Sequence, residues 1–291
     1  MPKRYTKRKL EVFAIHAHID KSQVDYQVLF KTIADIAAED RQIDGDERLY
    51  AVPTFEIKDG IASFVCYEGE RGLNPLIFNT SNAKERVEKL KRGEILATKT
   101  HGIIDIKNRI AIVEYNHRGA KAHDLAKVFE DCGRNSSKFP SLTIEFNPVV
   151  DEEFVKAIER FQRIRLASLR VAKPNINWSD HYHNLTEVAE DSDAQAMEVT
   201  FTASRGKTLS AKAGIVHFIK DLVRDKLSII KSAKVLGTRE NETAETAVSL
   251  AHHVEHQKVR VKLNDDGHVE SDDIEKRMQG YLHSRHERKA K

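Results

Sequence analysis

Cysteine and long apolar runs are scarce in this chain of 291 residues. Its two cysteines, Cys66 and Cys132, are too few for the disulfide framework of a small secreted domain, so we expect free thiols in a reducing compartment. No apolar run approaches the ~20 residues needed to cross a bilayer, and the opening MPKRYTKRKL has no apolar segment after its charges. These absences predict a cytoplasmic protein without membrane insertion.

Complete catalytic and cofactor-binding motifs are also missing. Gly206-Lys207-Thr208 resembles the end of a phosphate-binding loop, but Phe201 stands where the motif requires glycine. His16 and His18 fall on one face of a predicted strand, as in a metal site that Asp20 could complete, yet the repeated β/α pattern of the barrel hydrolases that use such a motif is absent. We therefore expect no cofactor and no metal, and the sequence leans away from an enzyme.

The strongest enzymatic alternative is a Mg²⁺-dependent nuclease. In such enzymes carboxylates hold the metal and a lysine helps to activate water. Asp44 precedes Glu56-Ile57-Lys58, and Glu94 precedes Asp105-Ile106-Lys107. Both triplets run into predicted hairpin turns, where charged residues are ordinary. The nuclease role of either triplet stays open at this stage.

Charged residues are abundant in the chain. Asp, Glu, Lys and Arg make up 32% of its residues, and the net charge is +3. The first ten positions hold no acid and five cations, which are Lys3, Arg4, Lys7, Arg8 and Lys9. A basic arm binds phosphate backbones by releasing counterions. The alternative reading of this segment is a solubilising, disordered start.

Further cations surround two predicted elements of the second half. One group flanks a predicted strand and consists of Arg163, Arg165 and Lys173. The other surrounds a predicted helix start, which is itself an anion site, and consists of Arg205, Lys207 and Lys212. Together with the basic arm, these residues are the predicted nucleic-acid contacts.

Hydrophobic periodicity predicts an α+β fold with two mixed α/β domains, mainly antiparallel sheets with helices packed on one face. Turn signals, above all Asp59-Gly60, predict hairpins over 49–67 and 94–115. Polar stretch 133–140 is the predicted boundary between an N-terminal domain, 1–138, and a C-terminal domain, 139–291.

Other elements follow from the same patterns. A β-α-β unit is predicted over 142–171, with a strand at 142–146, a helix at 151–161 and a strand at 165–171. Ser210 is the predicted cap of the helix at 212–227. The remaining predictions are strands at 10–17, 76–78, 196–203, 228–236 and 256–263, and helices at 22–38, 83–92, 121–132 and 272–286.

Two stretches, RIRLASLRVAKPN (163–175) and AMEVTFTASRGKTLS (196–210), look like segments of an uncharacterised bacterial family found near prophage and defence genes. The first half, with LYAVPTFEIKDGIASFVCY (49–67) after an amphipathic helix, is similar in layout to the RexA-type phage-exclusion proteins. This resemblance covers most of the chain in element order and includes no diagnostic catalytic motif, so no functional residue is carried over.

The resemblance implies a two-domain homodimer that binds DNA with little sequence preference, takes part in phage exclusion and relies on a membrane-protein partner encoded nearby. The sequence thus predicts a non-sequence-specific binder of double-stranded DNA, acting as a sensor or regulator in anti-phage defence. Two alternatives remain: a Mg²⁺-dependent nuclease effector, and a regulatory subunit that binds protein through an exposed hairpin edge.

Overall fold

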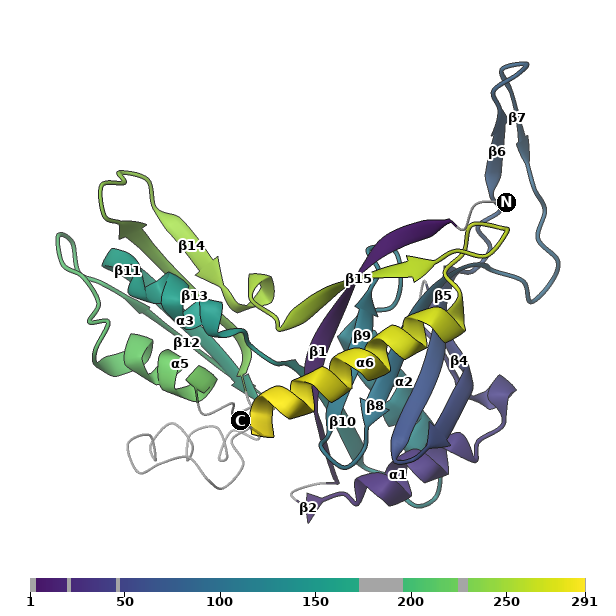
Figure 1. Cartoon of the computed structure of the whole chain (residues 1–291), viewed down its shortest axis with the longest axis horizontal. Helices are drawn as coiled ribbons and strands as arrows, with labels where there is room; N and C mark the ends of the chain where they lie inside the picture. Colours follow the sequence, from purple (N-terminus) through teal and green to yellow (C-terminus); the bar gives the residue numbers. More distant parts are fainter. Residues whose placement is uncertain (1–3, 20–21, 46–47, 173–195, 225–229, 291) are drawn as a thin grey trace. The chain divides into compact units, whose positions relative to one another are not determined.

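The computed structural model describes residues 4–19, 22–45, 48–172, 196–224 and 230–290. These residues form a mixed α+β fold that is mostly antiparallel sheet (Figure 1), as the sequence predicted. In the described ranges, no helix is both long enough and apolar enough to cross a membrane.

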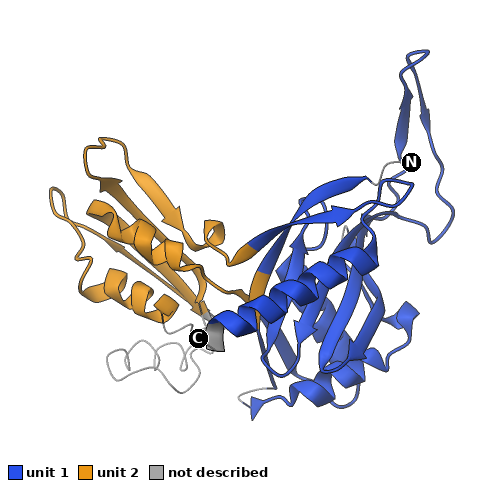
Figure 2. Ribbon diagram, in the orientation of Figure 1, with its two compact units in different colours: residues 1–11, 15–146, 257–291 blue, residues 12–14, 147–256 orange. Residues whose placement is uncertain are grey.

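The chain folds into two compact units rather than two consecutive halves (Figure 2). Unit 1 contains residues 1–11, 15–146 and 257–291, and unit 2 contains residues 12–14 and 147–256. The predicted boundary after residue 138 falls inside unit 1, because the strand that follows it joins the same sheet as the N-terminal strand. The C-terminal segment also belongs to unit 1, which local sequence patterns do not reveal.

The largest sheet among the described residues has nine strands, in the order β10-β1-β9-β8-β5-β4-β3, with β15 and β2 also paired to β1. Its strands are β1 (Tyr5–Ile19), β2 (Ser22–Gln23), β3 (Gln42–Asp44), β4 (Arg48–Lys58), β5 (Ile61–Glu70), β8 (Leu96–Asp105), β9 (Ile110–Tyr115), β10 (Leu142–Pro148) and β15 (His256–Lys262). Both predicted hairpins are confirmed. The β4–β5 turn takes positive φ at Asp59 and Gly60, as a tight hairpin turn requires.

Helices cover both faces of this sheet. On one face, α1 (Tyr26–Ala34) and α2 (Ala122–Asn135) enclose an aromatic core in which Phe129 lies 5.2 Å from Phe64 and 5.5 Å from Phe55, between ring centroids. On the other face lies α6 (Ser271–Ala290), which contacts β8. A 3₁₀ turn, η1 (Ala38–Asp40), follows α1.

A two-stranded arm projects from unit 1 between β5 and β8 (Figure 1). It consists of β6 (Leu76–Asn79) and β7 (Lys84–Val87), which pair with each other. The predicted helix over 83–92 is therefore wrong. The side chains of Asn79 and Asn82 accept the backbone N–H groups of Ser81 and Lys84 within the turn, and such local bonds compete with helix formation.

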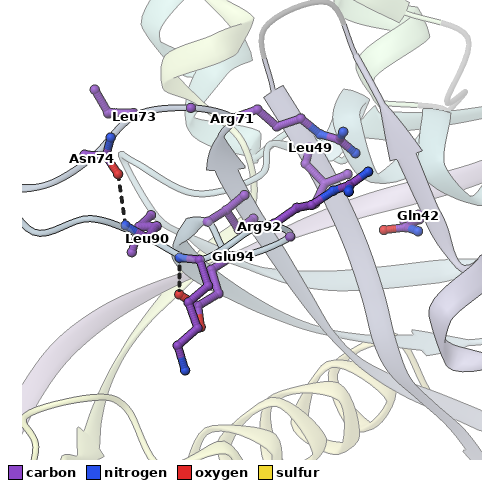
Figure 3. Close-up of a pocket in the computed structure, with 12 residues that line it drawn as sticks. Gln42, Leu49, Arg71, Leu73, Asn74, Leu90, Arg92 and Glu94 are labelled. Atoms are coloured by element: carbon purple, nitrogen blue, oxygen red, sulfur yellow. Dashed lines mark hydrogen bonds between the residues drawn. The ribbon is translucent and has the colours of Figure 1, made fainter.

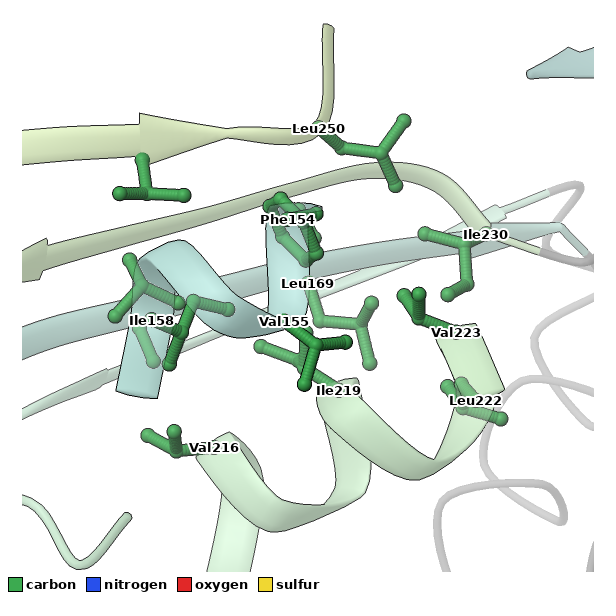
Figure 4. Close-up of a cluster of buried hydrophobic side chains, with 14 of the residues drawn as sticks. Phe154, Val155, Ile158, Leu169, Val216, Ile219, Leu222, Val223, Ile230 and Leu250 are labelled. Atoms are coloured by element: carbon green, nitrogen blue, oxygen red, sulfur yellow. The ribbon is translucent and has the colours of Figure 1, made fainter. Parts of the chain in front are cut away.

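Unit 2 is a four-stranded antiparallel sheet in the order β12-β11-β13-β14, with two helices packed over its apolar face (Figure 4). Its core includes Phe154 and Ile158 from one helix, and Val216 and Ile219 from the other. The elements are α3 (Glu152–Glu159), β11 (Phe161–Ala172), β12 (Ala196–Thr202), α5 (Gly214–Arg224), β13 (Ile230–Arg239), β14 (Thr246–Ser249) and η3 (Leu250–His252).

Two predictions for the second half are wrong. The β-α-β unit does not form, because β10 belongs to the nine-stranded sheet whereas β11 pairs antiparallel with β12 and β13 in unit 2. Ser210 does not cap α5, which begins at Gly214; its hydroxyl accepts the N–H of Lys212 in the preceding turn, at 3.2 Å.

Candidate nucleic-acid interface

Three of the N-terminal cations, Lys7, Arg8 and Lys9, belong to strand β1 and not to a free arm. Two backbone hydrogen bonds of 2.9 Å join β1 to β15, from Val12 N to Glu255 O and from Leu263 N to Arg4 O. Residue numbers rise along one strand as they fall along the other, so the strands are antiparallel. Both strands have the same number of residues between the two bonds, so neither strand contains a bulge there.

This register places Lys7 opposite Arg260 and Lys9 opposite Lys258. Residues directly opposite in an antiparallel pair share a face, as do alternate residues of one strand, which lie ~6.6 Å apart. The shared face therefore gathers cations from both ends of the chain. We call it the basic face, and its cations are Lys7, Lys9, Lys258, Arg260 and Lys262.

Aromatic rings lie among these cations. The Arg260 guanidinium lies 4.6 Å from the centroid of the Tyr5 ring. The Lys9 and Lys121 ammonium groups lie 5.3 and 5.2 Å from the centroid of the Tyr115 ring. Tyr5 and Tyr115 are 37% and 44% exposed, so each offers a π surface next to positive charge, the combination that single-stranded nucleic acid contacts by stacking.

Little negative charge offsets the basic face. Glu11 pairs with Lys9 at 2.7 Å. Within the part of the chain that the structure describes, neither Lys7 nor Lys258 has a carboxylate partner, and both are exposed. These ammonium groups are available to phosphate.

Arg8 points to the opposite face and has a structural role. Its Nε lies 2.9 Å from Oε1 of Glu114, whose side chain is 2% exposed. The other oxygen of Glu114 lies 2.7 Å from Nδ1 of His101, and Nε2 of His101 lies 3.0 Å from the hydroxyl of Ser271 at the start of α6. This buried network joins β1, β9 and β8 to α6. Of the other predicted N-terminal contacts, Arg4 is exposed and Lys3 lies outside the described residues.

The predicted cations of unit 2 are only partly brought together. Arg163 donates from Nε to the carbonyl oxygen of Lys207 at 3.4 Å, so these two residues are neighbours, and Arg205 lies in the same exposed turn. Arg165 is held by Glu245 at 2.6 Å, which offsets its charge. Lys212 is exposed but precedes α5, and Lys173 lies outside the described residues.

The carboxylates of the nuclease hypothesis do not assemble. Asp44 lies opposite Leu49, seven positions along β4 from Glu56, a distance of about 23 Å at ~3.3 Å per residue. Asp44 instead pairs with Arg71 at 2.9 Å. Lys58 is exposed at the hairpin turn.

The second triplet, Asp105-Ile106-Lys107, lies at the β8–β9 turn, which Asp105 stabilises. Asp105 accepts the backbone and side-chain N–H groups of Asn108 at 3.0 and 2.8 Å, and lies 3.1 Å from Nε2 of His286. Lys107 is exposed in the turn, and Glu94 accepts the backbone N–H of Lys91. Over the described ranges, no group of three His, Cys, Asp or Glu side chains is arranged to hold a metal ion.

A polar cavity of about 540 Å³ lies at the base of the arm (Figure 3). It is lined by cations, including Lys91 and Arg92, and by Asn74, whose side chain accepts the N–H of Leu90 at 2.9 Å. This bond and the backbone bond from Glu88 N to the carbonyl oxygen of Pro75, at 2.9 Å, join the two ends of the arm. We assign the cavity to support of the arm.

Sequence reasoning missed the β15 half of the basic face. The signal was present, because Lys258, Arg260 and Lys262 alternate with valines in KVRVK, the pattern of a strand with one charged face. What the sequence did not show is that this strand pairs with β1, from the other end of the chain.

The fold and the basic face define the class: an α+β protein whose main sheet carries a row of cations with tyrosines among them. Residues 13–291 match the family described as "Family of unknown function (DUF6731)", and the chain belongs to this family. None of the curated proteins matches it. The β15 cations lie inside the matched range, whereas Tyr5, Lys7 and Lys9 precede it.

Proposed function

We propose that this protein binds nucleic acid, double-stranded DNA above all, through the basic face of unit 1. The observation that supports the proposal most directly is the alignment of five cations on two paired strands with Glu11 as their one carboxylate neighbour on β1. Such a row matches a phosphate backbone, whose charges repeat along the strand.

Binding of this kind has little sequence preference. Lysine acts as a compact point charge that satisfies phosphate without reading base edges. A sensor or regulatory role in anti-phage defence, with a membrane-protein partner, depends on the resemblance to phage-exclusion proteins and stays a prediction.

The test is a titration of labelled duplex DNA, single-stranded DNA and RNA by fluorescence anisotropy across a salt series. If the five cations each neutralise one phosphate, the affinity for duplex falls roughly 10²- to 10³-fold between 50 and 200 mM salt. The double variant Lys258→Glu/Arg260→Glu lowers the affinity at least ~10-fold and flattens the salt dependence.

The matched control is Lys58→Glu. It reverses one charge of the same sign at an exposed lysine. The register from β4 through β5 and β8 to β9 places Lys58 at the end of the sheet opposite Tyr115. We expect binding within about twofold of the unmodified protein. Absence of binding to every nucleic acid at 50 mM salt, or equal loss in the control and the double variant, contradicts the proposal.

A second function, self-association through the arm, is favoured by a separate observation. Leu76, Phe78 and Val87 share one face of the arm and are 61%, 59% and 55% exposed. A two-stranded hairpin is marginally stable alone. The apolar part of this face, which lies beside Glu85, is complementary to the same part of a second copy across a twofold axis. The arm is thus our proposed contact for the predicted homodimer.

Light scattering coupled to size exclusion tests this contact. Phe78→Ser is expected to convert a dimer to a monomer, while Lys84→Ser on the opposite face of the arm leaves the dimer intact. A monomeric unmodified protein, or a dimer unaffected by Phe78→Ser, contradicts it.

A further inference from the structure

A groove of about 580 Å³ opens beside the basic face, between the β1–β15 pair and α6. Its lining includes Tyr5 and Arg260 on the strand side, and Lys276, Arg277, Gly280 and Ser284 on α6. All of these residues belong to unit 1. Arg260 lines the groove and is also part of the basic face, so the two surfaces are continuous.

Small residues leave the helix side of the groove open. Gly280 and Ser284 are one helical turn apart and therefore lie on the same side of α6. A Cβ atom added at Gly280 would meet no atom within 4 Å. Gly280 does not have the positive φ that would require glycine, so local backbone geometry does not explain this residue in the middle of a helix, where glycine is unfavourable.

The walls of the groove carry the chemistry that recognises a nucleotide. The Tyr5 ring and the Arg260 guanidinium, 4.6 Å apart, offer planar surfaces on which a base stacks. Lys276 and Arg277 are exposed cations on the opposite side, and Arg277 lies 3.7 Å from Asp273. A base stacked on the exposed side of either planar group would leave its phosphate on the side of the α6 cations.

The groove distinguishes unpaired from paired bases. Inside a duplex both faces of a base are covered by its stacked neighbours, whereas an unpaired base exposes them. Pockets of ~300–1,000 Å³ are the size that takes one small ligand, so the groove has room for a nucleotide and not for a duplex.

We propose that the groove binds one unpaired nucleotide at a single-stranded end or gap of the nucleic acid that the basic face holds. This inference rests on the proposed function and adds a substrate class to it: DNA with a junction between duplex and single strand. The phosphate row of the basic face holds the backbone, and the groove selects the unpaired base.

The decisive variant is Gly280→Leu, which fills the groove. Leucine is a better helix former than glycine, so the helix is not weakened. Its matched control is Gln279→Leu, one residue away on α6, exposed and outside the groove lining. Tyr5→Ala and Tyr5→Phe form a second pair, because stacking needs the ring and not the hydroxyl.

Affinities are measured by anisotropy for a blunt duplex and for the same duplex with a short single-stranded overhang. The unmodified protein is expected to prefer the overhang roughly 10-fold, the order that stacking of one base provides. Gly280→Leu removes the preference while affinity for the blunt duplex stays within about twofold. Tyr5→Ala also removes the preference. Gln279→Leu and Tyr5→Phe retain it.

The outcomes separate the two proposals. Equal affinity of the unmodified protein for blunt and overhang DNA, or an unchanged preference in Gly280→Leu, overturns the groove inference and leaves the basic face standing. Failure of both DNAs to bind at low salt overturns the proposed function, and the groove inference with it.

Discussion

The basic face of unit 1 and the predicted cations of unit 2, which include Arg163 and Arg165, look alike in sequence. They differ in the residues that surround them. On the basic face, Lys7 and Lys258 stand exposed on paired strands. In unit 2, Arg165 is bound to Glu245 at 2.6 Å, and Arg163 donates to a backbone carbonyl. A count of cations along the chain does not distinguish a site from a set of internal bonds, because the distinction lies in which acids and carbonyls the fold brings near.

The same contrast holds for the carboxylates that bind arginine in the two units. Glu114 in unit 1 is 2% exposed and serves both Arg8 and His101. Glu245 in unit 2 is 38% exposed and serves Arg165, which is 47% exposed. A buried charge that loses its partner is costly, whereas an exposed pair is screened by water.

The largest expected effect tests this comparison by removing each of the two carboxylates, Glu114 and Glu245. Glu114→Ala leaves Nε of Arg8 and the buried ring of His101 without their acceptor inside the protein, and we expect unit 1 to lose about 3 kcal/mol of unfolding free energy. Glu245→Ala in unit 2 is expected to cost less than about 1 kcal/mol. Urea unfolding followed by circular dichroism measures both.

Glu114→Gln sharpens the result, because an amide retains hydrogen bonds to its neighbours but not the charge that balances Arg8. Its loss should fall between those of the two alanine variants. Similar losses for Glu114→Ala and Glu245→Ala would show that burial does not separate the two pairs.

The next effect compares the cations themselves. Arg163→Glu/Lys207→Glu in unit 2 introduces the same change of charge as Lys258→Glu/Arg260→Glu on the basic face. We expect less than about a threefold loss of duplex affinity for the first and at least ~10-fold for the second. These losses correspond to less than about 0.7 kcal/mol and more than about 1.4 kcal/mol of binding free energy. Titrations at one fixed salt concentration measure the gap, and a larger loss in unit 2 would move the site there.

Local patterns in the sequence were sufficient for much of the fold. The Asp59-Gly60 turn and the alternating strands around it predicted β4 and β5, because the turn chemistry and the period-two pattern act over a few residues. The same local information misled over 83–92, where charged residues resemble a solvated helix. There the asparagine turns and the pairing of β6 with β7 determine the outcome.

The candidate site depends on long-range pairing and was only half visible. Lys7 and Lys9 were predicted as phosphate contacts from charge alone. Lys258 and Arg260 were not, because their pairing with β1 joins the two ends of the chain. Arg8, between two contacts in sequence, faces the other way, since neighbouring residues of a strand point to opposite faces.

The smallest expected effect is slow labelling of the cysteine thiols, which reports on unit 1 alone. Both thiols lie in unit 1, because unit 2 contains no cysteine. Burial raises the pKa of Cys66 to about 12 and that of Cys132 to about 11, compared with about 8.5 for a free thiol. At pH 8 the folded protein therefore holds both groups as unreactive thiols, and labelling by a disulfide reagent should be slow.

Labelling then requires unit 1 to open, so its rate compares the two units. Glu114→Ala should accelerate the reaction of Cys66 and Cys132, because weaker folding raises the population of the open form. Glu245→Ala should leave the rate unchanged if unit 2 opens without unit 1. Rapid labelling of the unmodified protein would contradict the burial of both thiols, and equal acceleration by the two variants would mean that the units unfold together.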